Sequence, residues 1–115
     1  MTMASLTEEF DYCWTIFYPH FPYLQKPSLH LRKLSSAWGI CDGQTITLSP
    51  LLQDAKTDFV QHVIFHEMCH LIYPNHKREF YDLLKKFDPM QKKEDSKRQK
   101  RLNELVQLKE EITIL

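Results

Sequence analysis

The N-terminal part of the chain has the hydrophobic spacing of an amphipathic helix. Its apolar residues recur three or four positions apart, which places them on one face of a helix. These residues are Leu6, Phe10, Cys13, Trp14 and Phe17. Pro19 and Pro22 follow the pattern and would end the helix. We therefore predict a helix over 6–18 with its apolar face on the core.

Two later segments alternate between apolar and polar residues, which is typical of half-buried strands. The first segment is 28–34, in which only the first part alternates, and the second is 44–48. The stretch from Trp38 to Gly43 between them has the composition of a turn region, in which Gly43 can adopt a positive φ. We expect two strands here, and the second could lie beside a cleft and pair with an extended peptide.

The segment 59–73 is apolar around most of a helical circumference, as expected for a buried helix. Thr57 or Asp58 can cap its first turn, and Pro74 ends it. Ionisable side chains nevertheless interrupt this apolar surface. They are His62, His66, Glu67 and His70. Because buried ionisable groups are costly unless they are paired or bound to a metal, this helix is where chemistry is expected.

A further helix is predicted over 77–87, and Pro89 ends it. From about residue 92 the chain is strongly charged, and we expect a helical extension over 91–115. A length of 115 residues indicates one domain, so we place its main part at 1–90 and treat the extension as part of the same domain.

Composition and charge exclude several classes of protein. The chain has 15 basic and 15 acidic residues, so no overall charge calls for nucleic acid. Only 92–101 is locally basic; a solvated helix face is the ordinary interpretation, and contact with nucleic acid is the alternative. No apolar run approaches the roughly 20 residues of a membrane span, and no secretion signal is visible. Three widely spaced cysteines do not form a disulfide framework, so we expect a soluble cytoplasmic protein.

The run His66-Glu67-Met68-Cys69-His70 has the H-E-x-x-H pattern on a predicted helix. Residues four apart lie one turn above each other, so both imidazoles can reach one Zn²⁺ ion. Glu67 lies beside the same face and can take a proton from a metal-bound water. We therefore predict a zinc site with His66 and His70 as ligands and Glu67 as the catalytic base.

A catalytic zinc needs a third protein ligand and one open position. His76 follows the Pro74-Asn75 break, where the chain must turn back toward the helix. We favour His76 as this ligand, and Glu79 is the competing candidate.

The chain resembles the YgjP-like and SprT-like zinc metallopeptidase families over roughly 28–90. The YgjP-like pattern is a Trp-Gly turn, a short strand, H-E-x-x-H, and a third histidine after Pro-Asn and before Phe-aromatic. The matching residues are Trp38-Gly39, Ile46-Thr47-Leu48, His66-Glu67, His70, Pro74-Asn75-His76 and Phe80-Tyr81. The chain departs from the pattern at Ala37 and Ile40, where the family usually has Arg and Ser.

The resemblance implies an α+β fold, with a small antiparallel sheet packed on a buried active-site helix. It also implies zinc ligands His66, His70 and His76, with Glu67 as general base. The expected activity is cleavage of peptide bonds, with a peptide or an unfolded protein as substrate and no membrane partner. Tyr73 and Tyr81 are candidates for stabilising an oxyanion, although each is more often a packing aromatic.

Two alternatives to a peptidase remain open. In the first, zinc only holds the helix to the following turn, and the chain is a binding module without activity. In the second, the same metal-activated water cleaves a phosphoanhydride bond of a nucleotide. Replacement of the family's arginine by Ala37 removes a cation that would favour this second reaction.

Overall fold

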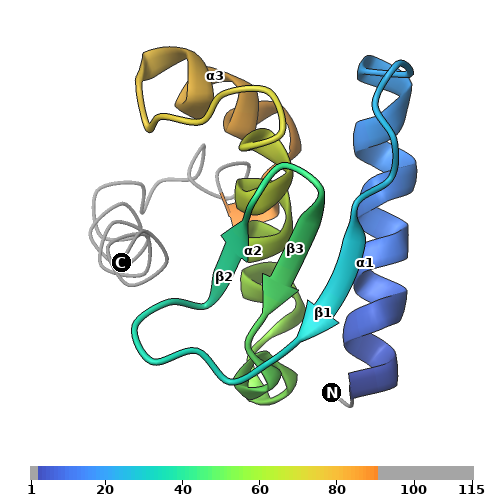
Figure 1. Ribbon diagram of the computed structural model, residues 1–115, viewed down its shortest axis with the longest axis vertical. Coiled ribbons are helices and arrows are strands. Elements are labelled where there is room, and N and C mark those ends of the chain that lie inside the picture. Colours follow the sequence, from blue (N-terminus) through green and yellow to red (C-terminus); the bar gives the residue numbers. More distant parts are fainter. Residues whose placement is uncertain (1–2, 91–115) are drawn as a thin grey trace, which may run out of the picture.

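The computed structural model describes residues 3–90, which form three α-helices and a small three-stranded sheet (Figure 1). In chain order the elements are α1 (Met3–Phe17), β1 (Ser28–Leu31), β2 (Gly39–Cys41), β3 (Thr45–Leu48), α2 (Thr57–Cys69) and α3 (Arg78–Phe87). Short 3₁₀ helices follow α1 and β3, at Tyr18–His20 and Pro50–Asp54. The α+β class is confirmed. The extension predicted over 91–115 lies outside the described residues, together with its basic stretch.

The sheet is mixed, whereas we expected an antiparallel one. Its strand order is β1-β3-β2, with β3 parallel to β1 and antiparallel to β2. The chain leaves β1, forms β2 at the far edge, and then returns as β3 through a tight turn. Gly43 has a φ of 97° in that turn, as predicted, and the Asp42 carboxylate accepts the backbone N–H groups of Gln44 and Thr45. Alternation of side chains identifies a strand but not the direction of its partner.

Two expectations about this region are therefore wrong. The stretch from Trp38 to Gly43 is not only a turn, because it contains strand β2. Strand β3 is also unable to pair with a peptide, since β1 and β2 already take the hydrogen bonds on both of its sides. Strand β2 forms the edge of the sheet opposite β1.

Helix α2 lies behind β2 and β3 in Figure 1 and contacts α1, α3 and these two strands. Its buried residues form much of the core, together with the apolar face predicted for α1. The N-cap position belongs to Lys56, which makes no side-chain cap, so the caps predicted at Thr57 and Asp58 are wrong. Helix α2 also ends at Cys69 rather than at residue 73. Pro74 disfavours helical geometry in the residue before it, and the chain tightens into turns over 70–73.

Helix α3 begins one residue after its predicted start and ends where predicted, at Phe87. Its buried face consists of Phe80, Leu83, Leu84 and Phe87. Within the part of the chain that the structure describes, none of the helices has the length and apolar character needed to span a membrane.

Candidate metal centre

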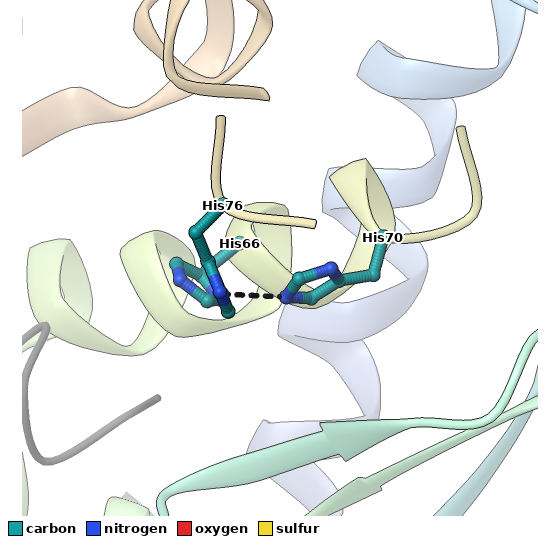
Figure 2. Close-up of side chains that lie close together, drawn as sticks. All are labelled: His66, His70 and His76. Atoms are coloured by element: carbon teal, nitrogen blue, oxygen red, sulfur yellow. Dashed lines mark hydrogen bonds between the residues drawn. The ribbon is translucent and has the colours of Figure 1, made fainter. Parts of the chain in front are cut away.

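Three imidazole rings converge at the C-terminal end of α2 (Figure 2). His66 lies in the last turn of the helix, His70 is the residue that caps its end, and His76 comes from the loop before α3. One nitrogen from each ring lies within 4.8 Å of the other two. The Nε2 atoms of His70 and His76 are 2.9 Å apart, close enough to share a hydrogen bond or a cation. The structure thus brings together the three histidines that the sequence predicted.

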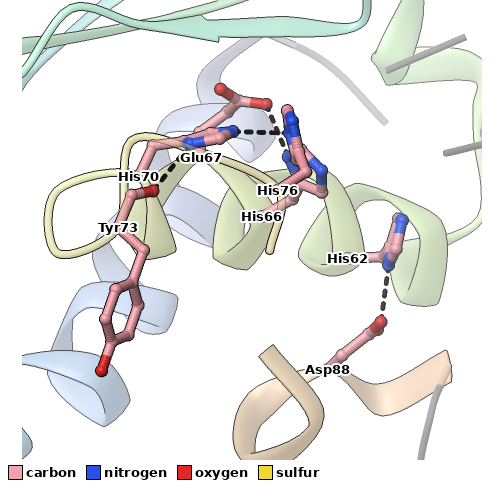
Figure 3. A network of polar contacts seen from close by, with 7 residues as sticks. All are labelled: His62, His66, Glu67, His70, Tyr73, His76 and Asp88. Atoms are coloured by element: carbon pink, nitrogen blue, oxygen red, sulfur yellow. Dashed lines mark hydrogen bonds and ion pairs between the residues drawn. The ribbon is translucent and has the colours of Figure 1, made fainter. Parts of the chain in front are cut away.

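In His66 and His70 the hydrogen bond to a neighbouring oxygen is made by Nδ1, which leaves Nε2 of each ring available to a metal ion. The Nδ1 atom of His66 is 3.1 Å from Oε2 of Glu67, and Nδ1 of His70 donates to the carbonyl oxygen of Tyr73 at 3.1 Å (Figure 3). With the proton on Nδ1, each ring keeps a lone pair on Nε2. Nε2 of His66 is buried and has no hydrogen-bond partner among the described residues. A buried nitrogen left in this way needs a partner, and a metal ion can be that partner.

Burial also sets the protonation states at this centre. It lowers the pKa of His66 to about 3, and it lowers the pKa values of His70 and His76. The rings are therefore neutral at pH 7, which is the form that binds metals. Burial raises the pKa of Glu67 to about 7, although the nearby rings of His70 and His62 oppose this shift. A carboxyl group with a pKa near neutrality is suited to both taking and returning a proton.

A cleft of about 510 Å³ opens over the centre. Glu67, His70 and His76 line one wall of it, and β2 with the turn that follows lines the other. Both positions at which the sequence departs from the YgjP-like pattern, Ala37 and Ile40, lie on this cleft. The charged residues of the lining are Asp42 and Glu67, and among the described residues that line the cleft there is no lysine or arginine.

Strand β2 lies close to Glu67 because residue 39 has no side chain. A Cβ atom at Gly39 would be 3.0 Å from Cγ of Glu67 and 3.2 Å from Cγ1 of Val63. Contacts of this length are tighter than about nine in ten Cβ contacts in proteins, so the buried side chains of Glu67 and Val63 would have to shift by a few tenths of an ångström. Glycine at this position thus sets the distance between the strand and the carboxylate.

We expect Gly39→Ala to destabilise the protein by about 1–3 kcal/mol, the usual cost of overpacking a core. The measurement is urea unfolding of the purified chain. Ile40→Ala is the control, since the Ile40 side chain is 44% exposed and its loss should cost no more than about 0.5 kcal/mol. Equal stability of the Gly39→Ala variant and the parent chain would contradict this close packing.

None of the other candidates from the sequence belongs to the histidine cluster among the described residues. Glu79 is exposed in the first turn of α3 and is not among the residues that converge on the three rings. Tyr73 contributes its carbonyl group, while its phenol points away from the histidines (Figure 3). The ring of Tyr81 lies 6.3 Å from that of His76, centroid to centroid. The structure therefore favours His76 over Glu79 as the third member of the set.

The partner of His62 is not evident from the sequence. Its Nδ1 atom lies 2.6 Å from Oδ2 of Asp88, and both side chains are fully buried (Figure 3). The pair joins α2, one turn before His66, to the residue that follows α3. The sequence did contain one signal, since a histidine on an apolar helix needs a partner. It could not identify a partner 26 positions away.

Comparisons with known proteins identify a similar fold and a matching family. The crystal structure of the metallopeptidase zymogen of Pyrococcus abyssi abylysin has a similar fold, with a TM-score of 0.64 and 18% sequence identity. The alignment covers 90% of this chain and 93% of that one. No curated protein matches the sequence. The profile of the YgjP-like metallopeptidase domain matches residues 3–104, nearly the whole chain, and the protein therefore belongs to the YgjP-like metallopeptidase family.

Proposed function

We propose that this chain is a zinc-dependent peptidase in which His66, His70 and His76 hold the ion and Glu67 is the general base. Membership of a metallopeptidase family supports a metal-dependent hydrolase. The observation that carries the residue roles is the buried Glu67 carboxyl group, which lies beside the cluster of three neutral imidazoles and lines a cleft together with His70 and His76.

The donor set is consistent with zinc. Neutral imidazole nitrogens are among the ligands that zinc prefers, and three of them with one open position is a common catalytic arrangement. A bound ion would also give the buried Nε2 atom of His66 the partner that it lacks among the described residues. When bound, zinc supplies a Lewis acid that lowers the pKa of water and polarises a carbonyl group.

Glu67 performs the proton transfers in this proposal. Its carboxylate takes a proton from the attacking water and later donates it to the leaving amine. A pKa raised to about 7 means that the group is partly ionised at neutral pH and returns the proton easily. His66 is hydrogen-bonded to Glu67 through Nδ1 and so helps to fix the orientation of the carboxylate.

The lining of the cleft favours a peptide over a nucleotide. Phosphoanhydrides carry several negative charges and are usually bound by arginine, lysine or backbone N–H groups. The cleft instead has acidic side chains and no cationic ones among its described lining residues. Strand β2 lines the cleft at the edge of the sheet, where the backbone of an extended peptide can pair with it. An unfolded protein or a peptide is thus the proposed substrate.

The first test is the metal content of the purified full chain. We expect one zinc ion per chain, and we expect His66→Ala to weaken zinc binding at least about 100-fold, the upper end of what loss of an outer partner costs. His30→Ala is the matched control, because His30 is an exposed histidine of β1 and should leave zinc binding unchanged. Undiminished zinc in the His66→Ala variant would eliminate the proposed ligand set.

The second test is the reaction. The zinc-loaded chain is incubated with an unfolded, alkylated protein and separately with nucleoside triphosphates, and products are identified by mass spectrometry and phosphate release. Peptide fragments that disappear when a chelator is added and return with zinc support the proposal. Phosphate release without peptide cleavage would replace it with the nucleotide alternative.

A further inference from the structure

We infer that Phe80 is a positioning residue of the metal centre, which holds all three histidine rings in place from outside the lining of the cleft. This inference rests on the ligand set of the proposed function. Phe80 is fully buried in the first turns of α3 and is absent from the cleft lining. Its ring centroid is 4.9 Å from that of His66, 4.6 Å from that of His70 and 4.9 Å from that of His76.

The geometry of these contacts restricts each imidazole differently. The rings of His66 and His76 stand nearly perpendicular to Phe80, at 73° and 74°, while that of His70 is tilted by only 32°. Aromatic rings at these separations attract each other in edge-to-face and offset arrangements. Rotation of any of the three imidazoles about its side-chain bonds would therefore bring it into the Phe80 ring or remove a favourable contact.

Hydrogen bonds alone do not orient this centre. Metal-binding histidines are usually fixed by a hydrogen bond from the second ring nitrogen to a carboxylate or carbonyl group. His70 has such a bond to Tyr73, but the carboxylate beside His66 is Glu67, which the proposed reaction uses. For His76, the contact with His70 is the one hydrogen bond found within residues 3–90. An aromatic ring packed against all three imidazoles can replace these missing constraints.

Phe80 is itself held firmly. Helix α3 packs its apolar face on the core, and Phe87 near its end stacks on Phe65 at 5.5 Å. Directly after the helix, Asp88 forms the buried pair with His62 of α2. The helix that carries Phe80 is thus fixed to the helix that carries His66, and the ring cannot follow the histidines if they move.

The chain offers a matched control for this inference. Phe87 lies on the same helix and is 95% buried, since its relative exposure is 5%, but its recorded ring contacts are with Phe17, Phe65 and His20 rather than with the metal cluster. Phe80→Leu and Phe87→Leu remove the same atoms from the core. Any difference in metal binding between the two variants therefore reports on contact with the three imidazoles.

The experiment measures zinc affinity of both full-length variants by competition with a chromophoric chelator, and records the visible spectrum of the Co²⁺-substituted forms. We expect Phe80→Leu to weaken zinc binding about 10- to 100-fold and to change the Co²⁺ bands, as loss of an outer partner does. Phe87→Leu should keep the zinc affinity within about twofold of that of the parent chain and should leave the Co²⁺ bands unchanged. Equal zinc affinity and equal spectra for two folded variants would overturn the inference.

Two further measurements keep the inference testable if Phe80→Leu does not fold. Phe80→Met replaces the flat ring with a flexible side chain that can fill an irregular gap in the core. It should still weaken zinc binding about tenfold. In the zinc-loaded parent chain, nuclear Overhauser contacts should join the Phe80 ring protons to ring protons of His66, His70 and His76. Absence of those contacts would overturn the inference without any variant. The two proposals fail in different ways. Weaker zinc binding in Phe80→Leu does not contradict the proposed zinc ligands. Unchanged zinc binding in His66→Ala would contradict those ligands.

Discussion

Replacement of Glu67 by glutamine is expected to lower the rate of peptide cleavage by about 10²- to 10⁴-fold, the usual contribution of a general base. Glutamine has the same shape but cannot accept and return a proton. The carboxyl group is buried and faces the cleft, and burial raises its pKa to about 7, so no other described side chain on the cleft is as well placed for the transfer. Turnover number at saturating peptide is the quantity to measure.

Zinc content is the essential control for this variant. Glu67→Gln should retain about one zinc per chain, because the carboxylate is not one of the three proposed ligands. Glu79→Gln, an exposed change on α3, should retain both zinc and activity. Full peptide cleavage by Glu67→Gln would remove the proposed base, and a folded, zinc-loaded parent chain that cleaves nothing would support the binding-module alternative.

The second large effect concerns stability rather than catalysis. Asp88→Ala should lower the free energy of unfolding by about 1–3 kcal/mol, the usual cost of leaving a buried polar group without its hydrogen-bond partner. His62 would then be left without the one hydrogen bond that its ring makes, in a fully buried position. This is a large share of the total stability of about 5–15 kcal/mol expected for a small domain. Urea unfolding of the metal-free chain measures it.

Asp82→Ala provides the comparison, because Asp82 is exposed and its contact with Arg78 is a loose surface pair at 3.6 Å. Such pairs contribute at most about 1 kcal/mol. The double variant His62→Leu with Asp88→Ala should be more stable than Asp88→Ala alone, since it no longer buries an unpaired imidazole. If Asp88→Ala and Asp82→Ala lower the free energy of unfolding by the same small amount, the pair of His62 with Asp88 does not hold α3 to α2.

Much of the helical structure could be predicted from the sequence. Apolar residues repeat over several turns in α1 and α3, so the period identifies both helices to within a few residues. The H-E-x-x-H spacing predicts that His66 and His70 lie one turn apart at the end of α2, and the Pro74-Asn75 break predicts the return of His76. Local spacing was sufficient here because these residues are close together in the chain.

Features that depend on distant residues could not be predicted. The parallel pairing of β1 with β3 leaves no trace in their alternation, and β2 is three residues long and begins with a glycine. The contacts of Phe80 and the pair of His62 with Asp88 arise only when α3 packs against α2. A periodic pattern indicates that such a helix has a buried face, but not which side chains of another helix it will meet.

The early end of α2 has a thermodynamic consequence for the loop that connects it to α3. His70 and His76 are separated by five residues, and the turns over 70–73 already restrict several of them. Closing so short a segment costs little configurational entropy, because the cost grows with the length of the loop. Little of the free energy released when the histidines bind a metal ion would therefore be needed to order this loop. Most of it would contribute to the affinity for the metal.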